Sequence, residues 1–165
     1  MRNLKFVSIL TIISVIISFS SCKEEESKTT DQKITWNLDD EKLVRAAILD
    51  YVEGLYLVDS TRIEKSVDST LRKIGYWYHP KEKGYRDNLP MSYNQLVSLS
   101  ANWNKSGNNT SDTSPKEIEI YDVNTKTASA KLTAEWGVDY FHLSKVNNQW
   151  KIMNVIWQSM PKTEK

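Results

Sequence analysis

The sequence contains a single cysteine and five glycines among 165 residues, and it has almost no excess of charge of either sign. One cysteine cannot form an internal disulfide or build a thiolate metal site. The 22 Lys and Arg against 21 Asp and Glu leave a formal charge of +1, which offers no polycationic surface for neutralising phosphates. Glycine-rich phosphate loops and metal-ligand spacings are also lacking. Nucleic-acid-binding proteins, disulfide-framed proteins and metalloproteins are therefore disfavoured, and no metal or cofactor is expected.

Long hydrophobic runs are missing too, except near the N-terminus. Two basic residues, Arg2 and Lys5, precede an uncharged and mainly apolar run over residues 6–19. At 1.5 Å per residue a helix of this length would reach about 21 Å, which is short of the roughly 30 Å hydrocarbon core of a bilayer. This is the size of the apolar region of a signal peptide. Residues 1–21 are therefore predicted to be a signal peptide.

The cysteine follows this run directly. Phe19-Ser20-Ser21-Cys22 resembles a bacterial lipobox, in which the cysteine is acylated, palmitate being one such acyl chain, and becomes the new N-terminus. The resemblance implies that Cys22 is a lipid anchor at the outer membrane of a Gram-negative bacterium. The next residues, Lys23-Glu24-Glu25-Glu26, resemble a signal for export to the cell surface, and a periplasm-facing location is the alternative. For Cys22 itself, the alternative is a buried free thiol.

Residues 22–35 have little apolar surface and are predicted to be a disordered tether. Residues 36–160 are predicted to form one domain, because no linker or repeat divides them and a domain averages about 150 residues. Three helices are expected first. One begins at Asp39, where acidic residues precede an apolar stripe at helical spacing, and a second runs from Thr61 to near Gly75. The third follows the Ser92-to-Gln95 spacing of a capping box.

Two features refine this helical part. Gly54 lies inside the first helix, where glycine costs about 1 kcal/mol relative to alanine, so we expect another segment to approach it closely. Residues 76–80 are aromatic and could be a strand or a loop, whereas residues 81–90 are polar enough to be an exposed loop. Residues 104–115 hold many turn-forming residues and are also predicted to be a loop.

The rest of the chain alternates between apolar and polar side chains, as strands do. Strands are expected around residues 118–120, 127–136, 138–146 and 150–157, with Asn147-Asn148 as a tight hairpin turn between the last two. Early helices followed by a meander of strands indicate an α+β fold. The helices are expected to cover one face of a curved antiparallel sheet.

Several segments resemble the putative lumazine-binding family of the nuclear transport factor 2-like, or cystatin-like α+β cone, superfamily. They are residues 48–56, 67–73 and, above all, the closing hairpin formed by 138–146 and 150–157. The resemblance covers roughly residues 40–158. It implies three N-terminal helices packed on a curved sheet around a cone-shaped cavity, often in a homodimer formed through the sheet face. It does not fix a chemistry, because one fold hosts many functions.

Asp139 is the candidate catalytic residue, because it shares a strand face with Phe141 and Leu143. A carboxylate set into an apolar wall, near Tyr51 or Tyr140, resembles the general base of ketosteroid isomerase, an enzyme of the same superfamily. His142 is three residues away, so strict alternation places it on the opposite face from Asp139. The alternative for Asp139 is a structural role at a strand end or as a loop cap.

The candidate ligand-binding residues are mainly aromatic side chains that would either line a cone or fill it. They are Tyr51, Trp136, Tyr140, His142 and Trp157. The leading hypothesis is a lipid-anchored module that binds a small hydrophobic or aromatic molecule, or another protein, without catalysis. The alternative is an acid-base isomerase or dehydratase that acts on a small cyclic hydrophobic compound in the cavity.

Overall fold

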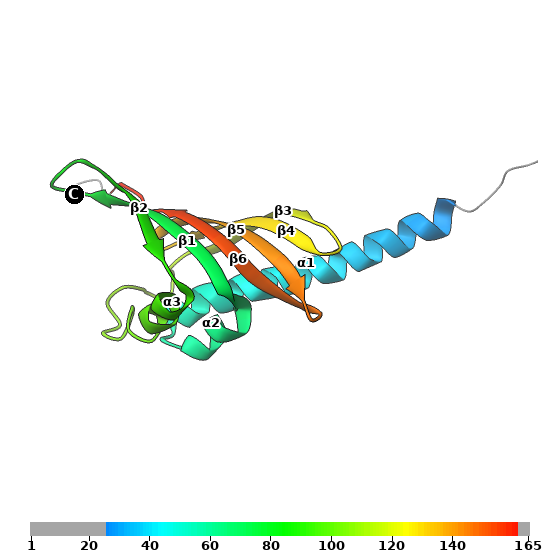
Figure 1. Cartoon of the computed structure of the whole chain (residues 1–165), viewed down its shortest axis with the longest axis horizontal. Coiled ribbons are helices and arrows are strands. Elements are labelled where there is room, and N and C mark those ends of the chain that lie inside the picture. The colour runs from blue at the N-terminus through cyan, green and yellow to red at the C-terminus, as the bar shows by residue number, and fades with distance from the viewer. Residues whose placement is uncertain (1–25, 162–165) are drawn as a thin grey trace, which may run out of the picture.

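The computed structural model describes residues 26–161, with side-chain surroundings from Leu38 onward. In chain order its elements are α1 (Glu26–Tyr56), α2 (Ser60–Ser66), β1 (Val67–His79), β2 (Gly84–Met91), α3 (Tyr93–Ser100), β3 (Lys116–Val123), β4 (Thr127–Ala134), β5 (Gly137–Val146) and β6 (Gln149–Gln158). The helices lie on one face of the sheet, and the first part of α1 extends beyond it (Figure 1). Within residues 26–161, no helix combines the length and apolarity needed to cross a bilayer.

The six strands form one mixed sheet in the order β2-β1-β6-β5-β4-β3. All neighbouring strands are antiparallel except β1 and β6, which run parallel with Gly75 opposite Trp157. The prediction of a wholly antiparallel sheet is wrong at this pair. Parallel strands need a long crossover, and here all the later elements separate the two partners, so no local pattern reveals the pairing.

The helices differ from the predicted ones mainly at their ends. The first helix begins at Glu26 rather than Asp39, within the segment expected to be a disordered tether. That segment contains no glycine or proline, so nothing in it stops the helix from extending backward. The second helix ends at Ser66 rather than near Gly75, and its N-cap is Asp59. The third lies between β2 and β3, so the helices do not all precede the strands as predicted.

The segment after α2 is a strand and not the continuation of a helix. Val67 and Leu71 fit a four-residue helical repeat, but they also fit the two-residue repeat of a strand. In the structure Val67, Leu71, Lys73 and Gly75 are all buried positions of β1. The predicted loop over residues 81–90 is also partly wrong, because residues 84–91 form the exposed edge strand β2. Pro90 is tolerated there because an edge strand has one side without ladder hydrogen bonds.

Several local predictions are confirmed. The Ser92 and Gln95 side chains make the two reciprocal hydrogen bonds of a capping box at α3. The β5–β6 hairpin turns at Asn147 and Asn148, which both have positive φ angles as a tight turn requires. A Cβ atom on Gly54 would lie 3.0 Å from the Ile63 side chain, so α2 does approach α1 closely at this glycine.

One hydrophobic core fills the space between the helices and the inner face of the sheet. It includes Ile48, Tyr51 and Val52 from α1, together with alternate residues of the strands, such as Leu132 and Phe141. The burial pattern of β4 alternates strictly between buried and less buried positions. The apolar-in, polar-out alternation predicted for the strands is therefore confirmed, and it fixes which side chains face the helices.

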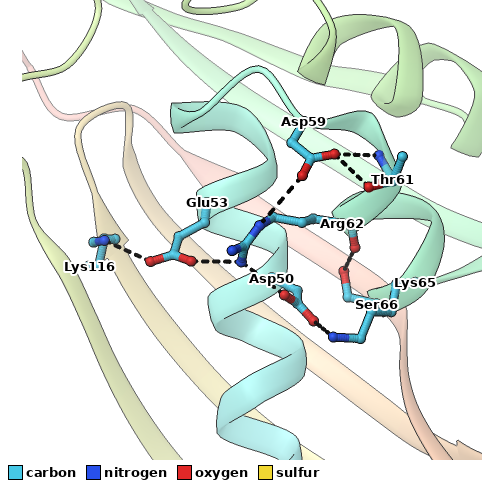
Figure 2. A network of polar contacts seen from close by, with 8 residues as sticks. All are labelled: Asp50, Glu53, Asp59, Thr61, Arg62, Lys65, Ser66 and Lys116. Atoms are coloured by element: carbon cyan, nitrogen blue, oxygen red, sulfur yellow. Dashed lines mark hydrogen bonds and ion pairs between the residues drawn. The ribbon is translucent and has the colours of Figure 1, made fainter.

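A network of charged side chains ties α2 to α1 and β3 (Figure 2). Arg62 lies 3.0 Å from Asp50 and 2.7 Å from Glu53, and Lys65 lies 2.7 Å from Asp50. Lys116 on β3 reaches the other oxygen of Glu53 at 2.9 Å. These side chains are partly exposed, and ion pairs of this kind contribute about 1 kcal/mol or less each. Arg62 also lies 3.7 Å from Asp59, so the network joins three cations and three carboxylates. It fixes the corner between α1 and α2.

Candidate functional site

A small apolar cavity lies between the helices and the inner face of the sheet. We call it the inner cavity. Its volume is about 80 Å³, and it is lined by Tyr51, Leu55, Lys73, Met91, Leu96, Leu99, Trp103, Trp136 and Trp157. Ligand pockets commonly measure about 300–1,000 Å³. The inner cavity is therefore large enough for a polar group or the edge of a ring, but not for a whole drug-sized molecule.

A buried polar cluster forms one side of this cavity. The Lys73 Nζ atom donates to an Asp139 carboxylate oxygen at 3.0 Å and to the Tyr51 hydroxyl at 2.7 Å. The Trp136 Nε1 atom donates to the second carboxylate oxygen of Asp139 at 2.5 Å. The Lys73 side chain is 5% exposed and that of Asp139 is fully buried. Both oxygens of the carboxylate are thus engaged by donors.

Three elements and one turn bring this cluster together. Tyr51 lies on the buried face of α1, Lys73 on β1, and Asp139 on β5, where it alternates with Phe141 on the inner face. Trp136 lies in the tight turn before β5, at whose end Gly137 has a φ angle of 134°. A Cβ on Gly137 would lie 2.1 Å from a backbone oxygen of β6, so only glycine fits at this position.

The cluster has unusual electrostatics because it is buried. Burial lowers the pKa of the Lys73 ammonium below its ordinary 10.5, although the charge of Asp139 and its hydrogen bond act in the opposite direction. Burial and the same negative charge raise the pKa of Tyr51 well above 10.0, so this hydroxyl stays neutral. Desolvating an ion pair is costly, and perturbed ionisable groups that line a cavity are candidates for function.

Three tryptophans form an aromatic wall, which we define as Trp103, Trp136 and Trp157. The rings of Trp103 and Trp136 meet edge to face with centroids 5.3 Å apart. The Trp157 ring lies against Gly75, whose missing side chain leaves room for it. The Trp157 Nε1 atom is buried and has no hydrogen-bond acceptor among the described residues. Such an unpaired donor costs about 1–3 kcal/mol, so an acceptor placed there would be favoured.

The same aromatic wall also lines a larger groove, which we call the outer groove. It has a volume of about 570 Å³ and is bounded by the β1–β2 hairpin, the loop after α3 and the end of β6. Its further lining residues include Trp77, Tyr78, Asn108, Asn109, Glu135 and Met160. The two spaces are adjacent, because all three tryptophans border both of them.

The structure brings together some of the predicted site residues and separates others. Tyr51, Trp136 and Trp157 line the inner cavity, and Asp139 belongs to the buried polar cluster at the side of this cavity. Tyr140 and His142 do not line it, contrary to the sequence prediction, because alternation along β5 turns both toward the outer face of the sheet. Tyr140 is 51% exposed. Cys22 lies outside the described residues.

Sequence reasoning misses Lys73. In the helix expected up to Gly75, a lysine at position 73 is ordinary. On a strand, however, Lys73 alternates with Leu71 and Gly75, and a lysine at a buried position of such a pattern is a signal for a functional group. Recognition of β1 as a strand is therefore the signal that points to Lys73.

A second cluster of the same three residue types lies near the closing hairpin. There Lys145 and Trp150 both donate to one oxygen of Asp40, at 2.6 and 3.0 Å. Lys145 is 21% exposed, and neither it nor Asp40 borders the inner cavity. This cluster provides an internal control for the Lys73 site. Among the described residues, no group of three or more His, Cys, Asp or Glu side chains is placed to hold a metal.

Comparison with solved structures defines the class of this domain. An NTF2-like protein of unknown function from Shewanella baltica is 18% identical with a TM-score of 0.52, and the match covers 76% of this chain and 97% of that one. An NTF2-like protein with a cystatin-like fold, from Novosphingobium aromaticivorans, is 10% identical with a TM-score of 0.56, covering 86% and 94%. The domain is thus an α+β protein of the nuclear transport factor 2-like (NTF2-like) fold.

The family assignment is narrower than the fold. The sequence model of the putative lumazine-binding family matches residues 39–158, and the chain belongs to this family. The resemblance noted from the closing hairpin is therefore confirmed. None of the curated proteins compared with this chain matches it.

Proposed function

We propose that the domain binds a small, uncharged ring compound, with one edge in the inner cavity and the remainder in the outer groove. The observation that carries this proposal is the buried Lys73–Asp139 pair at the side of an apolar cavity. A buried pair of this kind is often no more stabilising than apolar residues of the same volume. The position of Lys73 on the cavity wall favours a role in ligand binding.

The charges and donors of the cavity support a particular ligand chemistry. Lys73 and Asp139 neutralise each other, so a charged ligand would lose its hydration without gaining a free counter-ion. The unpaired N–H of Trp157 favours a ligand with an acceptor such as a carbonyl oxygen. The aromatic wall favours a flat ring, because indole faces stack well on planar groups. A neutral ring that carries a carbonyl meets all three conditions.

Lumazine is a suitable first probe, to be followed by other bicyclic diones. Binding should raise the melting temperature and quench tryptophan fluorescence. Trp157→Phe removes the N–H donor and should weaken binding about fivefold, the equivalent of one hydrogen bond of about 1 kcal/mol. Trp150→Phe is the matched control, because Trp150 donates to Asp40 away from the cavity. Equal affinities for the two variants would contradict the proposed position of the ligand beside Trp157.

Acid-base catalysis is the second candidate function. It is favoured by the 3.0 Å contact between a proton donor, Lys73, and a proton acceptor, Asp139, beside a cavity. Asp139 would have to release Lys73 in order to act as a base. Isomerisation of small cyclic ketones, followed by proton exchange with deuterated solvent, measures this activity. Activity that survives in Asp139→Asn would rule out the predicted catalytic role of this residue.

We also propose that the mature chain is attached to the outer membrane of a Gram-negative bacterium through acylated Cys22, facing the periplasm or the cell surface. The support is the lipobox-like segment at residues 19–22. Radiolabelled palmitate should label the wild-type chain in cells and fail to label Cys22→Ser. Protease treatment of whole cells distinguishes the two orientations, since only a surface-facing domain is cleaved.

A homodimer through the outer face of the sheet completes the proposal. Tyr140 and Ile156 are directly paired there across β5 and β6, and they are 51% and 53% exposed. Exposed apolar neighbours favour a contact surface. Ile156→Glu should convert a dimer into a monomer in analytical ultracentrifugation. Leu57→Glu is the control, because Leu57 is 63% exposed but lies directly after α1, which ends at Tyr56. A monomeric wild-type chain at micromolar concentration would refute the dimer.

A further inference from the structure

We propose that Lys73 captures a small neutral aldehyde or ketone covalently, by forming an imine between its Nζ atom and the carbonyl carbon. This inference rests on the proposed function, because the carbonyl compound must enter the inner cavity to reach the amine. It goes beyond reversible binding, since it assigns a nucleophilic role to a lysine that the sequence analysis did not single out.

The surroundings of Lys73 are those that activate a lysine. Its side chain is 5% exposed, and its Nζ atom lies 5.4 Å from the centres of both the Tyr51 and the Trp157 rings. Only two hydrogen bonds join the amine to described residues, although an ammonium group has three N–H bonds to donate. Desolvation of this kind favours the neutral, nucleophilic amine, and burial does lower the pKa of Lys73.

The neighbouring groups can move the protons that imine formation requires. Asp139, 3.0 Å from Nζ, accepts one ammonium proton and leaves a neutral amine. The amine lone pair forms the new C–N bond, while the carbonyl π electrons move to oxygen, which takes a proton from Asp139. The nitrogen still carries two protons at this stage, and one of them passes through the Asp139 carboxylate to the oxygen, which leaves as water. The iminium that remains then gives its last proton to the carboxylate. The balance is one amine plus one carbonyl compound giving one imine and one water.

The position of the neutral tyrosine suits the same step. The Tyr51 hydroxyl is 2.7 Å from Nζ, so it lies close to the oxygen of any carbonyl compound that reacts there. Because burial raises its pKa well above 10.0, this hydroxyl keeps its proton and can donate a hydrogen bond to that oxygen. The inner cavity of about 80 Å³ accommodates the reacting group, and larger substituents extend toward the aromatic wall.

Reductive trapping on the intact domain tests this inference. Cyclopentanone is the probe, because ketones form very little imine with solvated, protonated lysines. The protein is incubated with cyclopentanone and sodium cyanoborohydride near neutral pH, digested, and mapped by mass spectrometry. We expect one adduct on the peptide that contains Lys73, with the mass of the probe less one water plus two hydrogens. No adduct, or adducts spread equally over all lysines, would overturn the proposal.

Two variants provide matched controls. Lys73→Arg keeps the positive charge but cannot form the imine, so the adduct should be lost. Lys145→Arg alters the other Lys–Asp–Trp cluster, which does not border the inner cavity, and should leave the adduct unchanged. Should Lys73→Arg fail to fold, the wild-type peptide map alone decides. If lumazine binds but no Lys73 adduct forms, the covalent inference fails and the proposed function stands; if neither interacts, both fail.

Discussion

The contact between Gly75 and Trp157 allows a sharp test of how the aromatic wall is built. A Cβ atom at position 75 would lie 2.0 Å from Trp157 Nε1 and 2.1–2.4 Å from two neighbouring ring atoms. Ordinary contacts between carbon atoms are about 3.5–4.0 Å. In Gly75→Ala the indole must therefore move by roughly 1.5 Å or more, since the strand backbone beneath it is held in the sheet on both sides.

The cost follows from this displacement. Forcing one extra methyl group into a packed site costs about 1–3 kcal/mol. Replacing glycine by alanine in an extended strand recovers roughly 0.5–1 kcal/mol, because the unfolded chain loses freedom. We expect Gly75→Ala to be destabilised by about 1–2 kcal/mol in urea unfolding followed by tryptophan fluorescence. The same variant should also bind lumazine more weakly, because the displaced Trp157 ring borders both the inner cavity and the outer groove.

Gly84→Ala is the matched control for this experiment. Gly84 is also a strand residue, and neither glycine has a positive φ angle. A Cβ on Gly84 would meet only a backbone oxygen, at 3.8 Å, which is an ordinary contact. This variant should be as stable as the wild type or slightly more so. If the two variants differ by less than about 0.5 kcal/mol, which is typical of neutral surface substitutions, the steric argument is wrong.

Other contacts lead to three more predictions. Asp139→Asn should cost about 3–5 kcal/mol in urea unfolding, because it leaves the Lys73 charge buried and unpaired, and wild-type stability would contradict this. Burial opposes ionisation of Asp40, but hydrogen bonds from Lys145 and Trp150 lower its pKa below 3.8. The contribution of ionised Asp40 to the free energy of unfolding, measured against Asp40→Asn, should therefore be complete above pH 3.8 and disappear as the pH falls further. A difference in the free energy of unfolding between the two proteins that stays constant down to the acid limit would refute this. Asn148 has a φ angle of 61°, so Asn148→Val should cost about 1–2 kcal/mol while Asn148→Gly should not, as equilibrium unfolding can measure.

The parts of the fold that sequence can predict are those held by local rules. The two asparagines at 147 and 148 favour positive φ angles, and their neighbours alternate, so the closing hairpin follows from about twenty residues. Likewise, Ser92 and Gln95 cap α3 through bonds that span only three residues. The inner and outer faces of β5 are predictable for the same reason, including the opposite placement of Asp139 and His142.

The parts that sequence reasoning misses depend on contacts between distant segments. Leu71 satisfies both helical and strand repeats, and only pairing with β6 and β2 makes its segment a strand. Lys73 is missed with it, because its burial exists only after β1 and β5 are in place 66 residues apart. The sequence does indicate aromatic side chains for the site, but the division of their surroundings into two spaces depends on the packing of Trp103, Trp136 and Trp157.

The length of α1 bears on how the domain would be presented at a membrane. The helix has 31 residues, and its first part extends beyond the sheet (Figure 1). At 1.5 Å per residue, the stretch from residue 26 to residue 38 measures roughly 20 Å. If the chain is acylated at Cys22, the first part of α1 would act as a stiff helical spacer, rather than a flexible tether, close to the attachment point. The height of the domain above the lipid would then depend on the tilt of α1. The outer groove would therefore face a restricted range of directions.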